Sequence, residues 1–291
     1  MIPNAFDYSA PRSLEEALSA LKTGGSGAKT LAGGQSLLPI LKLRLASPDR
    51  LIDLGRIPAL RRFIVNQDLI SIGALVTHAM IEDSTAVREV CPLLPEVAGC
   101  IGDRQVRNRG TIGGSLAHAD PAADWPAAVL ALDAELVAMS AGGIQRTIAA
   151  REFFKGLMKT ALAPGELLVE IRIRPPGAGG AAYQKVKQSA SGFAIAGVAA
   201  VLEYGQHRVC KRARIAVTGV ADHAFRAAAA EKAIEGKRLD ERAIFDASQR
   251  ATDGAEEPLS DLHASGEYRL HLARVHCARA LRRAAGLSAK P

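Results

Sequence analysis

The sequence predicts an α+β fold built from more than one domain. Its 291 residues are enough for two or three domains, and 48% of them are apolar, as in an ordinary globular protein. The run Pro175-Pro-Gly-Ala-Gly-Gly180 is the best candidate for a domain boundary. Beyond it, strand patterns come first and helix patterns follow, which is the order expected of an α+β domain.

The N-terminal part begins with a helix signal. Ser13-Leu-Glu-Glu16 has the pattern of a capping box, and apolar residues follow at helical spacing until Gly24-Gly25. The elements expected next are a strand over residues 29–32, a tight loop over 33–36, a helix over 37–45, and strands over 51–54 and 69–75.

The middle of the chain alternates between helical patterns and glycine-rich segments. Asp120-Pro121 predicts the cap and first residue of a helix over residues 122–132. The other expected elements are helices near 80–82 and 93–100, a polar loop over 103–109, a glycine turn over 110–115, a hairpin joining 135–139 to 145–148, and a strand over 167–174.

The C-terminal part reads as a sheet followed by helices. Strands are expected over residues 183–187, 195–204 and 213–220, and their length and alternation favour an antiparallel sheet. Helices are expected over residues 224–234, 240–249 and 268–285.

Several classes of protein are excluded by simple patterns. No apolar window approaches 18 residues, so we expect no membrane span, and the N-terminus lacks a secretory signal, so we expect a cytoplasmic protein. None of the four cysteines lies in a C-x-x-C pair, so we expect free, partly buried thiols and neither an iron–sulfur cluster nor a zinc site in this chain. They are Cys91, Cys100, Cys210 and Cys277.

The net charge of +7 does not indicate a nucleic-acid-binding protein. The basic residues are spread along the chain, aromatic residues make up only 4%, and no DNA-binding motif is present. The basic stretch over residues 279–283 falls on a helical pattern, so it forms either a solvated face or a docking face for a partner.

Two segments carry the strongest chemical signal. Each of Ala32-Gly-Gly-Gln-Ser-Leu-Leu-Pro39 and Thr111-Ile-Gly-Gly-Ser115 combines a Gly-Gly pair with hydroxyl residues. Glycine lets a phosphate approach the main chain, and turns of this kind direct N–H groups at an anion. A single such segment is typical of an ordinary turn, but two could hold a pyrophosphate from both sides. Neither fits the Rossmann, P-loop or nucleophile-elbow pattern.

Together these segments resemble a known family. The first segment, followed by Leu51-Ile-Asp-Leu54, and the second, with Arg107-Asn-Arg before it and His118-Ala-Asp-Pro121 after it, resemble the two signatures of the FAD-binding medium subunits of molybdenum hydroxylases. That family includes aerobic carbon monoxide dehydrogenase and xanthine dehydrogenase. The resemblance extends over nearly the whole chain. It implies a two-lobed FAD module of the vanillyl-alcohol oxidase (PCMH) type over residues 1–55 and 56–177, and a C-terminal domain of the CO dehydrogenase flavoprotein type over 178–291.

The resemblance also implies which residues hold the cofactor. The first segment would wrap the FAD pyrophosphate, the second would meet FAD from the other side, Asp124 would lie near the ribose or the phosphates, and a lysine would approach the flavin ring. The implied cofactor-binding residues are Ala32, Gly33, Gly34, Gln35, Ser36, Leu37, Thr111, Gly113, Gly114, Ser115, Asp124 and Lys187. No catalytic residue and no metal ligand is implied. The sequence departs from its relatives at Gly192, where many carry an acid, and at Ser115, where some carry Asp or Asn.

Some candidates near the second segment stay open. His118 is either a proton donor or covalent flavin anchor, or a loop histidine bonded to the backbone. Arg104, Arg107 and Arg109 either steer phosphates or a partner, or belong to a solvated loop. Asp120 is expected to cap a helix, and Trp125 to pack in the core.

The resemblance implies an electron-transfer subunit. FAD in this chain would pass electrons from 2Fe-2S clusters in a small partner chain to an external acceptor, while a large partner chain with the molybdopterin cofactor oxidises the substrate. A dimer of heterotrimers is implied. The alternatives are a self-sufficient FAD-dependent oxidase and a non-redox assembly subunit with the same fold.

Overall fold

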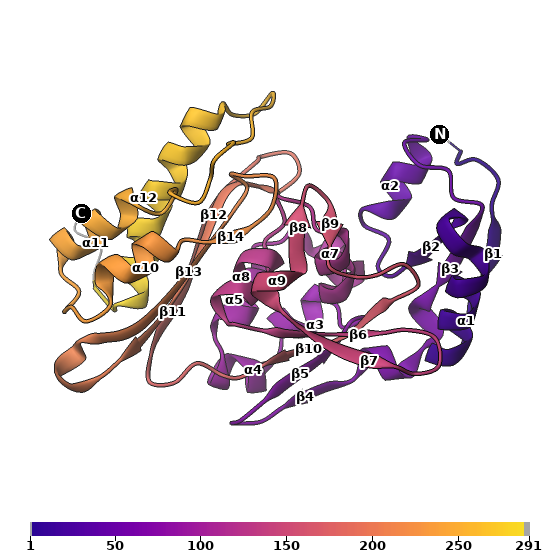
Figure 1. Ribbon diagram of the computed structural model, residues 1–291, viewed down its shortest axis with the longest axis horizontal. Helices are drawn as coiled ribbons and strands as arrows, with labels where there is room; N and C mark the ends of the chain where they lie inside the picture. Colours follow the sequence, from indigo (N-terminus) through magenta and orange to yellow (C-terminus); the bar gives the residue numbers. More distant parts are fainter. Residues whose placement is uncertain (1, 288–291) are drawn as a thin grey trace.

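Three sheets lie side by side along the molecule. The computed structural model describes residues 2–287, and the chain passes from an N-terminal lobe through a central domain to a C-terminal domain (Figure 1). The three sheets have three, five and four strands, and a separate two-stranded hairpin lies in the central domain. This arrangement confirms the predicted α+β fold.

The N-terminal lobe is a small parallel sheet in the order β1–β3–β2. Ser13 caps its first helix by accepting a hydrogen bond from the Glu16 N–H, and the helix ends at Gly24, as the capping box and the Gly-Gly pair predict. The elements of the lobe are β1 (Asp7–Ser9), α1 (Leu14–Gly24), β2 (Ala28–Leu31), α2 (Leu37–Lys42) and β3 (Arg50–Asp53).

The central domain contains an antiparallel sheet in the order β4–β5–β10–β6–β7. Its strands are β4 (Phe63–Val65), β5 (Ile70–Gly73), β6 (Glu135–Met139), β7 (Gln145–Ala149) and β10 (Leu167–Ile173), and the hairpin is formed by β8 (Phe154–Gly156) and β9 (Lys159–Thr160). Its helices are α3 (His78–Glu82), α4 (Thr85–Val90), α5 (Leu93–Gly99), α6 (Arg104–Arg109), α7 (Ile112–His118), α8 (Trp125–Ala131) and α9 (Ala150–Phe153).

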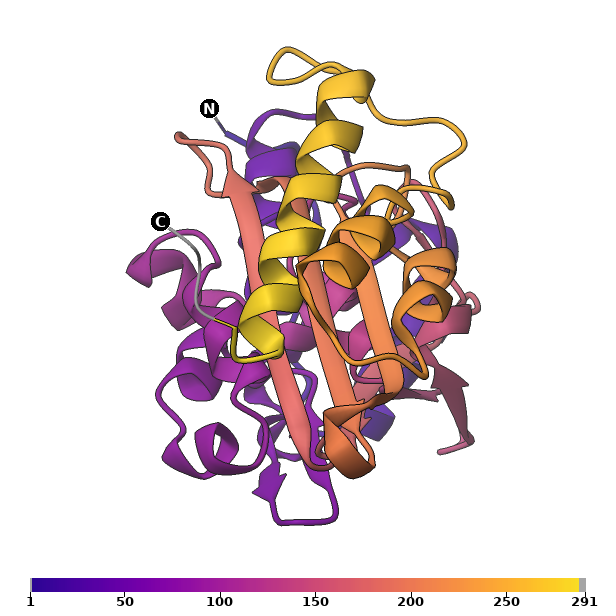
Figure 2. The same ribbon diagram turned by 90° about the vertical axis from the view of Figure 1, so that its left-hand side faces the viewer.

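The C-terminal domain is an antiparallel sheet covered by helices, as predicted. Figure 2 shows α12 lying along the strands, with α10 and α11 beside it on the same face. The elements are β11 (Gly179–Lys187), β12 (Ala194–Tyr204), β13 (Cys210–Thr218), β14 (Phe225–Arg226), α10 (Ala228–Ile234), α11 (Glu241–Gln249) and α12 (Gly266–Ala284).

The domains share their cores. The largest apolar cluster joins Trp125 and the other buried residues of α8 to Tyr183, Val201 and Ala216 from the inner face of the C-terminal sheet. A second cluster lies between the outer face of this sheet and its helices. The third joins the N-terminal lobe to the central sheet through Val137 of β6 and Val169 of β10. The central domain is therefore held on both sides by apolar packing.

Four local expectations were wrong. The stretch over residues 103–109 is not a loop, because Asp103 caps a helix there, α6. The Gly-Gly pair of the second segment lies in the first turn of α7. The helix expected over residues 122–132 begins only at Trp125, and Asp120 accepts a hydrogen bond from the Ala122 N–H in a turn instead of capping it. The helix expected over 224–234 begins at Ala228, because Phe225–Arg226 joins the sheet as β14.

The thiols lie as expected. All four cysteines are unpaired, and Cys100 alone is partly exposed while the other three are buried. Within residues 2–287, no helix is long and apolar enough to cross a membrane.

Candidate functional site

The two glycine segments, residues 32–37 and 110–115, lie against each other where the N-terminal lobe meets the central domain. Gly33 packs on the main chain of the other segment, so that a β-carbon there would overlap the Arg109 carbonyl oxygen and lie 2.8 Å from the Gly110 Cα. Gly114 faces back, and a β-carbon there would lie 3.3 Å from the Ala32 Cβ. The missing side chains therefore let the two segments interlock, which confirms that the fold brings the two segments together.

A cavity of about 240 Å³ opens beside this contact. It is lined by residues of both segments and by residues that follow β3 and β5. The lining residues are Ala32, Gly33, Asp53, Gly55, Arg56, Arg61, Leu75, Thr77, Asn108, Arg109 and Thr111.

The first glycine segment offers free backbone donors. Among the described residues, the N–H groups of Gly33, Gly34, Gln35 and Ser36 make no hydrogen bond. Gly34 has a φ of +78°, a conformation that favours glycine and turns the chain sharply between β2 and α2. Four consecutive unpaired N–H groups are the kind of donors that an anion requires, and the binding of a diphosphate by this segment stays a prediction.

The second glycine segment uses its backbone donors internally. Thr111 caps α7, because its Oγ1 accepts the Gly114 N–H at 3.1 Å. The Gly113 N–H donates to the Ala74 carbonyl at 3.0 Å, and the Ser115 N–H donates to the Thr111 carbonyl at 3.0 Å. The expectation that this segment directs a row of N–H groups at a phosphate was therefore wrong. Its remaining polar groups are the hydroxyls of Thr111 and Ser115.

Three arginines make the cavity positively charged. Arg56, Arg61 and Arg109 line it together with a single acid, Asp53. Asp53 is held by the Tyr8 hydroxyl at 2.7 Å and by the Gly55 N–H at 2.8 Å. A surplus of cations next to free N–H groups suits a diphosphate.

The sequence analysis missed the two arginines that follow β3. The signal was present, since Arg56 and Arg61 closely follow the Leu51-Ile-Asp-Leu54 strand whose neighbour β2 leads into the first glycine segment. Parallel strands end at the same edge of a sheet, so residues that follow them meet there.

The three arginines of α6 have three different environments. Arg107 is paired with Glu82 at 2.7 Å and also donates to the Ile101 carbonyl, so it holds α6 to α3. Arg109 lines the cavity, whereas the exposed Arg104 does not. Of the two interpretations of this stretch, phosphate steering therefore suits Arg109 alone.

Asp124 is enclosed between the central and C-terminal domains. Its side chain is 4% exposed, and its carboxylate accepts hydrogen bonds from the Tyr183 hydroxyl at 2.6 Å and from the Lys185 ammonium at 2.8 Å. Burial raises the pKa of the Asp124 carboxyl, and the pairing with Lys185 acts against that rise. The expectation of a ribose or phosphate contact does not match this geometry, because the side chain has almost no free surface.

Lys187 lies at the exposed end of β11, and its side chain makes no hydrogen bond or ion pair among the described residues. The loop that follows it packs against the central domain at Gly192. That glycine has a φ of +75°, and a β-carbon on it would lie 3.1 Å from the Gly102 Cα. A side chain at residue 192 would therefore be both strained and crowded in this conformation.

His118 and Trp125 are placed within helices. His118 is the last residue of α7 and partly exposed, so it is not a loop residue. Trp125 is fully buried, which confirms core packing, and its indole N–H also donates to His78 Nδ1 at 3.0 Å.

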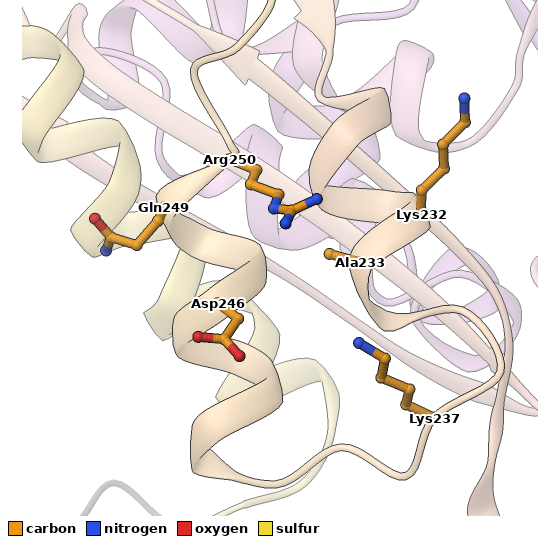
Figure 3. A pocket seen from close by; sticks show the side chains of 6 residues that line it. All are labelled: Lys232, Ala233, Lys237, Asp246, Gln249 and Arg250. Atoms are coloured by element: carbon orange, nitrogen blue, oxygen red, sulfur yellow. The ribbon is translucent and has the colours of Figure 1, made fainter.

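A second hollow lies far along the chain from the glycine segments. It measures about 540 Å³, lies between α10 and α11, and is lined by Lys232, Ala233, Lys237, Asp246, Gln249 and Arg250 (Figure 3). None of the residues predicted to bind a cofactor lines it. The described residues also contain no group of three or more His, Cys, Asp or Glu that could hold a metal ion.

Comparison with known proteins agrees with this geometry. Residues 4–176 match the family model of the FAD binding domain in molybdopterin dehydrogenase, and residues 181–284 match that of the CO dehydrogenase flavoprotein C-terminal domain. The chain is 41% identical to the carbon monoxide dehydrogenase medium chain of Hydrogenophaga pseudoflava, over 97% of each chain. It is 39% identical to the 6-hydroxypseudooxynicotine dehydrogenase complex subunit alpha of Paenarthrobacter nicotinovorans, over 98% of this chain and 96% of that one.

Solved structures show the same architecture. A carbon monoxide dehydrogenase from Hydrogenophaga pseudoflava, which lacks the Mo-pyranopterin moiety of its cofactor, superposes with a TM-score of 0.94 at 43% identity and covers 98% of this chain and 99% of its own. Quinoline 2-oxidoreductase from Pseudomonas putida 86 superposes with a TM-score of 0.91 at 37% identity, with the same coverage.

The interlocked glycine segments and the cationic cavity define a two-lobed module for a dinucleotide cofactor, and the C-terminal sheet completes it. The chain belongs to the family of FAD-binding medium subunits of molybdenum hydroxylases. Its residues fit FAD, because the free N–H groups of the first segment and the arginines around the cavity are the donors that a diphosphate requires.

Proposed function

We propose that the chain is the electron-transferring subunit of a molybdenum hydroxylase complex. FAD accepts electrons singly from iron–sulfur clusters and releases them in pairs, so it can link such clusters to an external two-electron acceptor. The 2Fe-2S clusters belong to a small partner chain and the molybdopterin cofactor to a large one, in a cytoplasmic dimer of heterotrimers. The free N–H groups of the first glycine segment are the single observation that carries the proposal, because they serve no purpose within the chain itself.

The role of each predicted site residue follows from its surroundings. The backbone from Gly33 to Leu37 binds the diphosphate, Arg109 neutralises it, and the hydroxyls of Thr111 and Ser115 donate to the cofactor from the other side. Ala32 and Gly114 keep the two segments in contact, and Gly113 packs against Ala74 of the central domain. We retain 1–55, 56–177 and 178–291 as the domain boundaries.

Lys187 supplies charge at the flavin ring. A cation near the ring stabilises the negative charge that accumulates there on reduction, and the exposed end of β11 leaves the Lys187 ammonium free for this contact. Asp124 is not a cofactor ligand in this proposal, because its carboxylate is already bound by Tyr183 and Lys185.

The proposal is tested by measuring electron transfer through the FAD of this chain separately from oxidation of the substrate. Stopped-flow absorption should show that dithionite reduces FAD in the full chain, whereas aldehydes, purines, nicotinate and carbon monoxide do not. The substrate of the complex should reduce this FAD only after the partner chains are added. Reduction of the lone chain by any of these substrates at the rate of the complex would show a self-sufficient oxidase. A chain that takes up no FAD would indicate an assembly subunit.

A further inference from the structure

Two consecutive residues at the start of α8 face different domains. Asp124 is bound by side chains of β11 in the C-terminal domain, and Trp125 is bound by His78 at the start of α3 in the central domain. We call these five residues the interdomain polar chain: Tyr183, Lys185, Asp124, Trp125 and His78.

Toward the C-terminal domain, the side chains of the interdomain polar chain are buried and fully paired. The side chains of Lys185 and Asp124 are 3% and 4% exposed. The Lys185 ammonium also donates to the Cys100 carbonyl at 2.8 Å, which fixes the end of α5. Lys187, the residue proposed to approach the flavin ring, follows Lys185 by two positions on β11. The contact with Asp124 therefore anchors β11 to the central domain two residues before Lys187.

In the central domain, the interdomain polar chain ends at the second glycine segment. An indole N–H can only donate, so His78 Nδ1 must be the acceptor and the ring carries its proton on Nε2. The His78 backbone N–H donates to the Gly110 carbonyl at 3.0 Å. The imidazole lies so close that a β-carbon on Gly110 would be 2.7 Å from Nε2. His78 thus fixes the residue that precedes Thr111 in the cavity wall.

We propose that the interdomain polar chain is a positioning device that sets the second glycine segment and the end of β11 relative to each other, and so controls FAD affinity without touching the cofactor. This inference rests on the proposed function of the cavity. Buried polar groups with directional partners hold one geometry, whereas the apolar packing around them tolerates small shifts. The residues act through Gly110 and Lys187, so they are positioning residues and not catalytic ones.

The test compares two conservative substitutions with two matched control substitutions in the full-length chain. Trp125→Phe removes the donor to His78 and keeps an aromatic ring, and Phe153→Leu is its control, because Phe153 is equally buried in the same core. Tyr183→Phe removes one hydroxyl, and Tyr204→Phe is its control, because it removes a hydroxyl from the same sheet outside the polar chain. FAD dissociation constants are measured by flavin fluorescence titration of the apoprotein, and stability by urea unfolding of the same apoprotein.

Trp125→Phe and Tyr183→Phe should each weaken FAD binding about three- to tenfold, which is the loss expected for one hydrogen bond. Phe153→Leu should lower stability at least as much as Trp125→Phe and leave FAD affinity unchanged. Tyr204→Phe, which removes a hydroxyl bonded to Arg208, should likewise leave FAD affinity unchanged. FAD affinity that follows stability across all four variants, or that stays constant in all of them, would overturn the inference. Absence of FAD binding by the wild-type chain would instead refute the proposed function.

Discussion

Gly33 lies directly on the carbonyl group of Arg109, although 76 residues separate them in the sequence. This contact joins the N-terminal lobe to the central domain at the point where the cavity opens. A glycine is therefore required at residue 33 for packing between the two segments, because the space next to its Cα is filled by protein and not by a phosphate.

Gly33→Ala should therefore separate the two glycine segments. The new β-carbon would overlap main-chain atoms that cannot move away cheaply, so we expect the free energy of unfolding to fall by about 1–3 kcal/mol and most of the bound FAD to be lost. Gly177→Ala is the control, since nothing lies within 4 Å of a β-carbon there. Urea unfolding and flavin content measure the two effects, and equal behaviour of the two variants would contradict the packing described here.

The hydroxyl of Thr111 should matter to the helix that carries the second segment. Thr111→Val leaves the Gly114 N–H without its acceptor, and loss of such a cap costs about 1 kcal/mol. Thr111→Ser retains the oxygen and should retain most of the stability. Thermal unfolding of the two variants side by side distinguishes a cap from a hydroxyl that acts only on the cofactor, for which the apoprotein would be unaffected by either change.

Arg109 should contribute charge to cofactor binding, whereas Arg104 on the same helix should not. Arg109→Gln removes a cation from the cavity wall, and loss of one charge-assisted hydrogen bond corresponds to roughly a tenfold increase in the FAD dissociation constant. The difference in FAD affinity between the wild type and Arg109→Gln should shrink as salt is added, because salt screens part of the attraction between the arginine and the diphosphate. Arg104→Gln alters the same net charge outside the cavity, so an equal effect of both substitutions would show that only overall charge matters.

The pH dependence of stability should contain a contribution from His78. Burial, with a smaller effect of the nearby Arg107 charge, lowers the pKa of His78 from 6.5 to about 4. Since the folded-state pKa lies below the unfolded one, this contribution is complete above pH 6.5 and is lost as pH falls toward 4. At 1.36 kcal/mol per unit, the loss amounts to about 3 kcal/mol.

His78→Gln is the matching variant, because its amide oxygen can still accept the Trp125 indole N–H while the side chain no longer titrates. Urea unfolding of both proteins between pH 7 and pH 4 should give curves that converge as the pH falls. Parallel curves would show that His78 does not titrate in this range.

Local sequence patterns predicted those parts of the fold that depend on neighbouring residues. The capping box at Ser13, the strand around residue 70 and the antiparallel C-terminal strands were all found where periodicity and caps place them. The helices α6 and α7 were missed, because one is polar and the other begins with a Gly-Gly pair, so neither shows an apolar helical period.

The site could be predicted only in part. Two Gly-Gly segments predicted a shared cofactor site. Their spacing could not show that the N–H groups of the second segment donate to Ala74 and Thr111. Likewise, the family resemblance implied that Asp124 is a cofactor ligand, and local pattern could not show its bond to Lys185, 61 positions away in the sequence. Which polar groups remain free is decided by tertiary contacts, and these are not encoded in local pattern.

The most direct test of the account is the flavin content of the purified full-length chain. The free N–H groups of the first glycine segment and the arginines of the cavity predict about one FAD per chain, held without a covalent bond. Acid precipitation should therefore release FAD into the supernatant, where its absorption spectrum identifies and quantifies it. A chain that contains no flavin and takes up none when FAD is supplied, or flavin that stays with the precipitate, would contradict the account.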